Sequence, residues 1–249
     1  IDATLGVEGL PQSGTGQATL LTGVNCARLA GRHYGPYPHS ATRATIAAKN
    51  VFRQIQERFP DEAEPVAFAN AYPDRFFRYA ARRDWWTVTT RCCLDASVRI
   101  RTAADLRRGD ALSADITGAG WPQPDSAIEP VTEEVAASRL AASARKRRFT
   151  LYEYYLTDKA GHARDHERAA GVLESLDRFF GGLANAVDDR GTILVSSDHG
   201  NLEDLSVKPH TLNPVPLLVR GPLAPFFRDV SDLTGVTPAI VEALSQTPP

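Results

Sequence analysis

Apolar residues recur along the chain at spacings that alternate between those of helices and those of strands. Apolar side chains three or four positions apart predict helices in four segments, residues 41–59, 132–146, 167–187 and 238–244. Short apolar runs predict strands in four others, residues 66–71, 149–156, 191–197 and 215–219. Because helices that alternate with strands cover both faces of a parallel sheet, the pattern predicts an α/β fold with a doubly wound, mainly parallel sheet.

Other segments have a weaker pattern. Residues 9–23 form a loop of small residues that turns into a short apolar helix and ends at Gly23. Residues 85–93 fit a strand or a helix, residues 103–130 indicate mixed loops, and residues 157–164 indicate a polar loop. We therefore expect one domain over residues 1–249, with room for a small cap or insertion within residues 72–121.

Charge and hydropathy exclude several classes of partner. The chain has 28 basic and 30 acidic residues and a net charge of -2, so it has no field that would attract nucleic acid or an anionic membrane. The sequence contains neither an apolar run long enough to cross a bilayer nor a signal peptide at its first residues. The cysteines, Cys26, Cys92 and Cys93, match neither a disulfide framework nor a metal site. We expect a cytoplasmic protein with reduced thiols.

Three clusters of metal-ligand residue types follow or precede predicted strands. Asp158 and His162 are separated by one turn, Asp198 and His199 are adjacent, and His210 stands ahead of the strand at residues 215–219. Open α/β sheets place their active sites in such loops. A carboxylate and an imidazole one turn apart can hold one divalent ion, whereas adjacent ligands that point in different directions suit two ions.

Together with the loop around Ser13, these motifs closely resemble the metal-site signature of the alkaline phosphatase superfamily. The resemblance is strongest to cofactor-independent phosphoglycerate mutases and phosphopentomutases, and it covers residues 10–35 and 151–222. It implies an alkaline phosphatase-like fold and a serine nucleophile at Ser13, which is followed by glycines at Gly16 and Gly23 as in the family. It also implies two metal sites, one held by Asp158, His162 and His210 and the other by Asp198, His199 and the Ser13 oxygen.

The relatives complete the second metal site with an aspartate at the end of their first strand. Asp2 lacks the preceding apolar strand that this pattern requires, so we do not assign it. The sequence also contains no methionine. We therefore expect an N-terminal strand that ends in a further aspartate to precede Ile1.

Thr15 is the alternative nucleophile, because its hydroxyl lies two residues beyond Ser13 in the same loop. The glycine spacing favours Ser13, and Thr15 would otherwise cap the following helix. Asn25, Arg32 and Lys159 are candidates for substrate binding, since an arginine pairs well with phosphate. A solvated loop for Asn25 and Arg32 and a surface position for Lys159 are the structural alternatives.

The chemistry of such a site is phosphoryl transfer. A divalent ion stabilises a serine alkoxide, and a second ion about 4 Å away stabilises the leaving oxygen. The mixed ligands fit Mn²⁺ or Zn²⁺, and the mutase resemblance favours Mn²⁺. Because residues 40–148 are too few for the largest caps of the mutases, we expect a hydrolase that cleaves a small phosphorylated substrate through a phosphoserine. The alternatives are a phosphomutase of the phosphoglycerate mutase type and a non-catalytic binding module with a depleted metal site.

Overall fold

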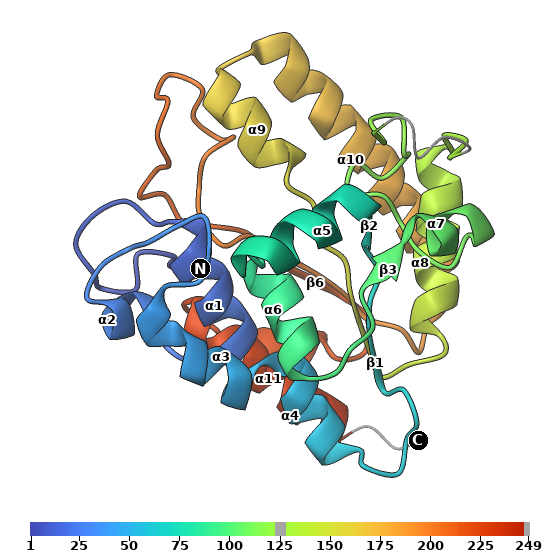
Figure 1. Cartoon of the computed structure of the whole chain (residues 1–249), viewed down its shortest axis with the longest axis horizontal. Helices are drawn as coiled ribbons and strands as arrows, with labels where there is room; N and C mark the ends of the chain where they lie inside the picture. The colour runs from blue at the N-terminus through green and yellow to red at the C-terminus, as the bar shows by residue number, and fades with distance from the viewer. Residues whose placement is uncertain (123–127, 247–249) are drawn as a thin grey trace.

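The computed structural model describes residues 1–122 and 128–246, in which helices alternate with short strands (Figure 1). The strands are β1 (Val66–Phe68), β2 (Ala71–Tyr72), β3 (Arg101–Thr102), β4 (Phe149–Leu151), β5 (Ile193–Ser196) and β6 (Leu217–Arg220). The helices are α1 (Ser13–Thr22), α2 (Cys26–Ala30), α3 (Arg43–Lys49), α4 (Val51–Arg58), α5 (Asp74–Arg83), α6 (Val88–Asp95), α7 (Ala103–Arg108), α8 (Glu133–Ala144), α9 (Leu156–Ala163), α10 (His166–Ala186) and α11 (Val236–Ser245). Short 3-10 helices are η1 (Ser40–Thr42), η2 (Ala224–Phe227) and η3 (Leu233–Gly235). The predicted α/β class is confirmed.

The strands of the described residues pair two by two. β1 pairs with β4 and β2 pairs with β3, both in parallel, as the sequence pattern predicts. β5 and β6 pair in antiparallel orientation, with Ile193 opposite Arg220. Two of these three pairs are therefore parallel, and the antiparallel pair is joined by the loop that carries the later ligand motifs.

Asn70 explains why the apolar run at residues 66–71 does not form one continuous strand. Its side-chain amide donates to the Glu153 carbonyl at 2.7 Å and accepts from the Glu153 N–H at 2.8 Å. This pair of bonds extends the link between the two segments beyond the last backbone pair of β1 and β4, while the backbone on either side of Asn70 pairs with Leu112, so the chain changes its partner at this residue. The chain after β4 is thereby held beside β1 up to the start of α9.

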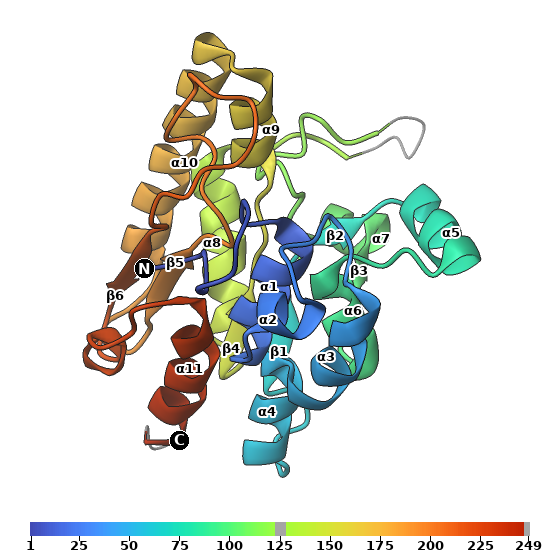
Figure 2. The same cartoon turned by 90° about the vertical axis from the view of Figure 1, so that its left-hand side faces the viewer.

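The helices form layers on either side of the strands. Figure 2 shows α8, α9 and α10 standing on one side of β1 and β4, with α3, α4 and α6 on the other. One core cluster joins α1, α4, α6 and β1 through buried apolar side chains such as Phe52, Phe68 and Val88. Another joins α8 and α10 through Ala137 and Phe179. Burial of these side chains supplies the main driving force that holds the layers together.

Three local predictions differ from the structure. The predicted polar loop at residues 157–164 is the helix α9, because packing of the buried Ala160 and Gly161 outweighs the low helix propensity of this segment. The predicted helix at residues 41–59 is divided at Asn50, whose extended backbone ends α3 and whose side chain caps α4. Residues 103–130, predicted as loops, contain α7, which begins with a capping box at Thr102 and Asp105.

Residues 72–121, where the sequence leaves room for a cap, contribute only in part to the hydrophobic core. α6 is buried through Val88, Cys92 and Cys93, and this helix settles the open choice between strand and helix around residues 85–93. By contrast, α5 projects from the body of the protein (Figure 2). A compact cap within residues 72–121 remains a prediction, and α5 is the element that it would include.

Candidate metal centre

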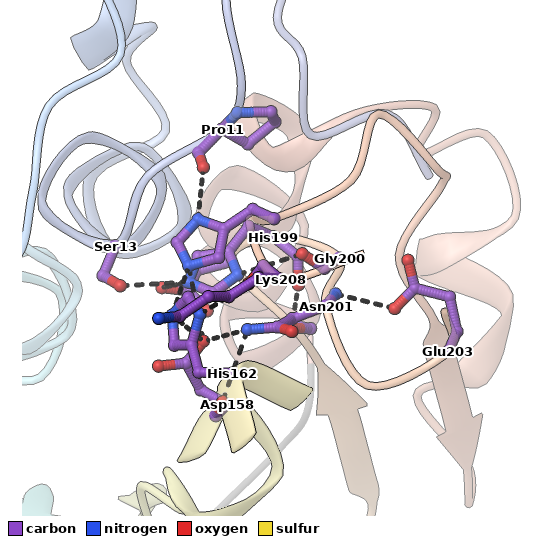
Figure 3. A network of polar contacts seen from close by, with 12 residues as sticks. Pro11, Ser13, Asp158, His162, His199, Gly200, Asn201, Glu203 and Lys208 are labelled. Carbon is purple, nitrogen blue, oxygen red and sulfur yellow. Dashed lines mark hydrogen bonds and ion pairs between the residues drawn. The ribbon is translucent and has the colours of Figure 1, made fainter. Parts of the chain in front are cut away.

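Four segments that are distant in the sequence bring the predicted site residues to one place. Ser13 is the first residue of α1, Asp158 and His162 lie on α9, and His199 follows β5 directly. Figure 3 shows these side chains gathered around a common point. His210, from the loop before β6, joins them through a contact of 3.1 Å between its Nε2 atom and that of His162.

Helix α9 explains the spacing of the first pair of ligands. Asp158 and His162 are four residues apart, so they lie on the same face of the helix, and the Asp158 Oδ1 atom is 3.3 Å from His162 Nε2. The same carboxylate oxygen is 3.4 Å from His210 Nε2. One carboxylate oxygen and two imidazole nitrogens therefore converge, which is the donor set predicted for the first metal.

Backbone carbonyls fix the orientation of two of the imidazole rings. The Nδ1 atom of His162 is 2.9 Å from the Lys208 carbonyl oxygen, and that of His210 is 2.6 Å from the Pro11 carbonyl oxygen. A carbonyl can only accept, so each Nδ1 donates and the Nε2 of the neutral ring is left with a lone pair. Metal-binding histidines in proteins are held in this way, with the second nitrogen hydrogen-bonded to a carbonyl or carboxylate.

The convergence of these lone pairs indicates a cation. Two neutral imidazole nitrogens 3.1 Å apart, both beside the Asp158 carboxylate, cannot hydrogen-bond to each other unless a proton or a metal ion lies between them. Burial raises the pKa of Asp158, but its close contact with the His210 imidazole and the hydrogen bond from Asn201 outweigh burial and lower this pKa to about 2. Asp158 is therefore a carboxylate at neutral pH, as a metal ligand must be.

The second pair of predicted ligands lies beside the nucleophile. The Ser13 hydroxyl oxygen is 2.9 Å from His199 Nε2, and that nitrogen is 3.6 Å from the Asp198 Oδ2 atom. Among the described residues this buried Asp198 oxygen has no hydrogen-bond partner. A buried carboxylate oxygen without a partner is costly, and a cation beside it would remove this cost.

The two predicted metal sites adjoin each other. The rings of His199 and His210 stack with their centroids 3.7 Å apart. Asp158, His199 and His210 each offer a ligand atom within 4.8 Å of the other two. This group thus combines ligands that the resemblance assigns to different ions, which is the arrangement expected where two metal sites adjoin. The donor set of carboxylates and imidazoles fits divalent cations.

Gly16 allows helix α1 to approach the second ligand pair. A Cβ atom built at this position would lie 3.2 Å from the Asp198 carbonyl carbon and closer still to its oxygen. Only a glycine therefore lets α1 pack on the backbone that carries Asp198 and His199. This close approach accounts for the glycine three residues after Ser13.

The hydroxyl of Thr15 is hydrogen-bonded to backbone groups and not to the predicted ligands. Thr15 is fully buried, donates to the Gln12 carbonyl at 3.3 Å and accepts from the Tyr34 N–H at 3.1 Å. The Ser13 hydroxyl, by contrast, contacts the predicted ligand His199. The geometry thus favours Ser13 over Thr15, and the choice of nucleophile remains a prediction.

The three predicted substrate-binding residues make contacts outside the ligand cluster. Asn25 accepts from the Arg28 N–H as the cap of α2 and donates to the Leu5 carbonyl at 2.9 Å. The guanidinium of Arg32 lies 5.6 Å from the centre of the Tyr34 ring. The Lys159 ammonium lies 4.4 Å from the centre of the Tyr155 ring, one residue from Asp158. Their part in substrate binding stays a prediction.

The sequence argument missed three partners of the ligands. Asn201 donates to the Asp158 Oδ1 atom at 2.6 Å, and this residue stands directly after Asp198, His199 and Gly200, so its position could have suggested a role. The carbonyls of Pro11 and Lys208 gave no such signal, because every residue has a carbonyl group. The unassigned Asp2 closes a turn by accepting from Thr4 and Leu5, outside the cluster.

Part of the chain matches a superfamily of metal-dependent enzymes. Residues 125–247 match the family described as the Metalloenzyme superfamily. The likeness to the alkaline phosphatase superfamily, which the motifs predicted, is thereby confirmed for this part of the chain. Within residues 1–122 and 128–246, no helix combines the length and apolar character that a membrane crossing requires.

The relatives that the chain matches are named as 2,3-bisphosphoglycerate-independent phosphoglycerate mutases. The protein of Thermomicrobium roseum is 30% identical over 140 residues, which cover 51% of this chain and 26% of that protein. The protein of Desulforudis audaxviator is 36% identical over 40% of this chain and 21% of its own length, and that of a Synechococcus strain is 39% identical over 39% and 20%. The matched part thus spans about a quarter or less of these relatives. No solved structure matches the chain.

Proposed function

We propose that this chain forms the catalytic core of a metal-dependent phosphoryl-transfer enzyme that uses Ser13 as its nucleophile. The observation that carries the proposal is the 2.9 Å contact between the Ser13 hydroxyl and His199 Nε2, at the edge of a cluster of converging imidazoles and carboxylates. A serine hydroxyl is a weak nucleophile until positive charge is placed beside it. Metal ions held by this cluster would place that charge beside the Ser13 hydroxyl.

The predicted ligands and Ser13 have separate roles in this chemistry. Asp158, His162 and His210 would hold one divalent ion, and Asp198 and His199 with Ser13 would hold the other. Bound ions would stabilise the serine alkoxide and neutralise the phosphoryl oxygens. The Ser13 oxygen forms a bond to phosphorus as the bond to the leaving oxygen breaks, which yields a phosphoserine and the dephosphorylated substrate.

Helix α1 contributes to phosphate binding. The Gln12 side chain makes no capping hydrogen bond, and the Thr15 N–H donates to the Tyr34 carbonyl at 2.8 Å, which leaves the N–H groups of Ser13 and Gly14 at the start of the helix. Such a helix N-terminus favours an anion through its N–H groups and its dipole. A phosphoryl group delivered to Ser13 would meet these donors.

The fate of the phosphoserine separates two candidates. The named relatives are phosphoglycerate mutases, which favours return of the phosphoryl group to a substrate hydroxyl over our sequence-based expectation of a hydrolase. Hydrolysis is the second candidate, because much of residues 40–148 is used in the core around Phe52, Phe68 and Val88 and not in a cap. Both candidates share the transfer to Ser13.

The remaining details are also part of the proposal. The metals are Mn²⁺ or Zn²⁺, since carboxylates suit the former and imidazoles the latter. The substrate is a small phosphorylated compound of the phosphoglycerate kind. The cysteines, all free and buried, are consistent with a cytoplasmic protein.

Turnover of p-nitrophenyl phosphate tests the proposal. The chain is stripped of metal with a chelator and assayed with added Mn²⁺ or Zn²⁺. We expect metal-dependent turnover that falls at least about 1000-fold in Ser13→Ala and is unchanged in Ser40→Ala, an exposed serine on η1. Turnover that needs no metal, or that survives in Ser13→Ala, would contradict it, whereas metal binding without turnover would support the non-catalytic binding module.

A second experiment separates mutase from hydrolase. Isotopically labelled phosphoglycerate is incubated with the metal-loaded chain and followed by NMR. Exchange between the phosphoglycerate isomers without release of free phosphate supports the mutase, and release of free phosphate supports the hydrolase.

A further inference from the structure

Glu203 lies in the loop between the adjacent ligands Asp198 and His199 and the later ligand His210, and its carboxylate bonds to both ends of this loop. One oxygen accepts from the Asn201 N–H at 2.7 Å. The other accepts from the Thr211 hydroxyl and from the Asn213 side-chain amide, the latter at 3.2 Å. Burial raises the pKa of Glu203, but these hydrogen bonds outweigh it and lower this pKa, so the group is an anion at neutral pH.

The groups that Glu203 binds are neighbours of proposed ligands. Thr211 follows His210, and its N–H donates to the Gly200 carbonyl at 3.2 Å, which joins the backbones next to His199 and His210. A Cβ atom at Gly200 would lie 2.6 Å from the Glu203 carboxylate and closer still to the Thr211 hydroxyl. Glycine at position 200 therefore makes room for the carboxylate that closes the loop.

Asn201 connects Glu203 to the third segment, the helix α9 that carries Asp158. Its backbone is held by Glu203, and its side-chain amide donates to the Asp158 Oδ1 atom at 2.6 Å (Figure 3). Asn201 is almost fully buried, with 4% of its surface exposed, so its amide has no water to replace this bond. One carboxylate thus links the segments that carry Asp158, His199 and His210, whose ligand atoms all lie within 4.8 Å of one another.

We infer that Glu203 is a positioning residue that sets the affinity of the proposed centre for divalent metal ions. The inference rests on the proposed function, because it takes Asp158, His199 and His210 as ligands. Groups that orient metal ligands without touching the ion commonly change metal affinity by about 10–100-fold when they are removed. A carboxylate that served only to stabilise a surface loop would leave that affinity unchanged.

The test is the affinity of the metal-free chain for Mn²⁺ alone and for Zn²⁺ alone, measured by isothermal titration calorimetry, with the unfolding temperature measured in a chelator. We expect Glu203→Ala to weaken the binding of the preferred ion by about 10–100-fold. Glu203→Gln keeps one acceptor oxygen, so its loss should be smaller. Thr132→Ala, which removes the cap of α8, is the control that lowers stability away from the cluster and should leave metal affinity unchanged.

Thr211→Val gives a second measurement if Glu203→Ala does not fold. This substitution removes the hydroxyl that donates to Glu203 and keeps the shape of the side chain, and it should weaken metal binding less than Glu203→Ala. Wild-type metal affinity in a folded Glu203→Ala, or in both Glu203→Gln and Thr211→Val, overturns the inference and leaves the proposed function intact. A wild-type chain that binds neither ion overturns the proposed function and the inference with it.

Discussion

The replacement of Gly161 by alanine should lower the metal affinity of the proposed centre, because it displaces one neighbouring side chain, that of Asn201. Gly161 lies on α9 against the side chain of Asn201, and an added Cβ atom would lie 2.5 Å from the Asn201 Cγ atom and closer to its amide oxygen. Carbon atoms in contact prefer about 3.5–4.0 Å. Asn201 must therefore retreat from α9 by at least about 1 Å.

That retreat breaks the bond that orients Asp158. The Asn201 amide now donates to the Asp158 Oδ1 atom at 2.6 Å, and an increase of about 1 Å moves it beyond hydrogen-bond range. Loss of such a partner lowers metal affinity by about 10–100-fold. The overpacking itself should cost about 1–3 kcal/mol of the free energy of unfolding.

Gly171→Ala is the matched control, because it makes the same change in a helix where space is open. Among the described residues, no atom outside the backbone of α10 itself and the two neighbouring residues lies within 4 Å of a Cβ built at Gly171. Alanine is a better helix former than glycine, so this variant should gain about 0.5–1 kcal/mol of stability. Its metal affinity should equal that of the wild type.

Calorimetric titration with Mn²⁺ and with Zn²⁺ and thermal unfolding in a chelator measure both effects. The two alanine variants should move stability in opposite directions, and only Gly161→Ala should lose metal affinity. Equal metal affinity in Gly161→Ala and Gly171→Ala would refute the argument that Asn201 orients Asp158.

Three further predictions use other parts of the structure. Gly16→Ala should push α1 away from the Asp198 backbone and reduce metal-dependent turnover of p-nitrophenyl phosphate by about 100-fold, with wild-type turnover as the contrary result. Thr132→Ala should lower the free energy of unfolding by about 1 kcal/mol in denaturant titrations, since it removes the cap of α8; an unchanged value would contradict the capping role. The hydrogen bond from Arg178 lowers the pKa of Glu133 from 4.5 to about 2, so the stability it contributes is present above the higher value and lost as the pH falls through the lower one. Glu133→Gln should therefore cost about 1–2 kcal/mol above about pH 5 and little near pH 2, and a cost independent of pH would contradict this.

The sequence predicted those elements whose own pattern is strong. Residues 167–187 were predicted as a helix and form α10 within one residue at each end, because the apolar face with Val172, Phe179 and Leu183 repeats over five turns. The polar sequence of α9 gave no such signal. That helix is stabilised by the burial of Ala160 and Gly161 against other segments, and tertiary contacts of this kind cannot be seen in a local window.

The candidate site, too, could be predicted from the sequence only in part. Residue types, spacing and the family resemblance together selected Ser13, Asp158 and His199, because few side chains can hold a metal or act as a nucleophile, and their roles stay predictions. The antiparallel pairing of β5 and β6 did not follow from their apolar runs, since a buried run looks alike in either orientation. The contacts of the imidazole Nδ1 atoms with backbone carbonyls were likewise beyond prediction, because they depend on the path of the chain.

One of those carbonyls connects the two halves of the proposed chemistry. Pro11, which accepts from His210 Nδ1 at 2.6 Å, is separated from the first residue of α1 by Gln12 alone. A movement of the His210 ring therefore moves the loop that positions Ser13. A metal ion bound by His210 would fix this ring and, through Pro11, the nucleophile beside it. We therefore expect metal binding by His210 and the placement of the Ser13 hydroxyl to be coupled through Pro11.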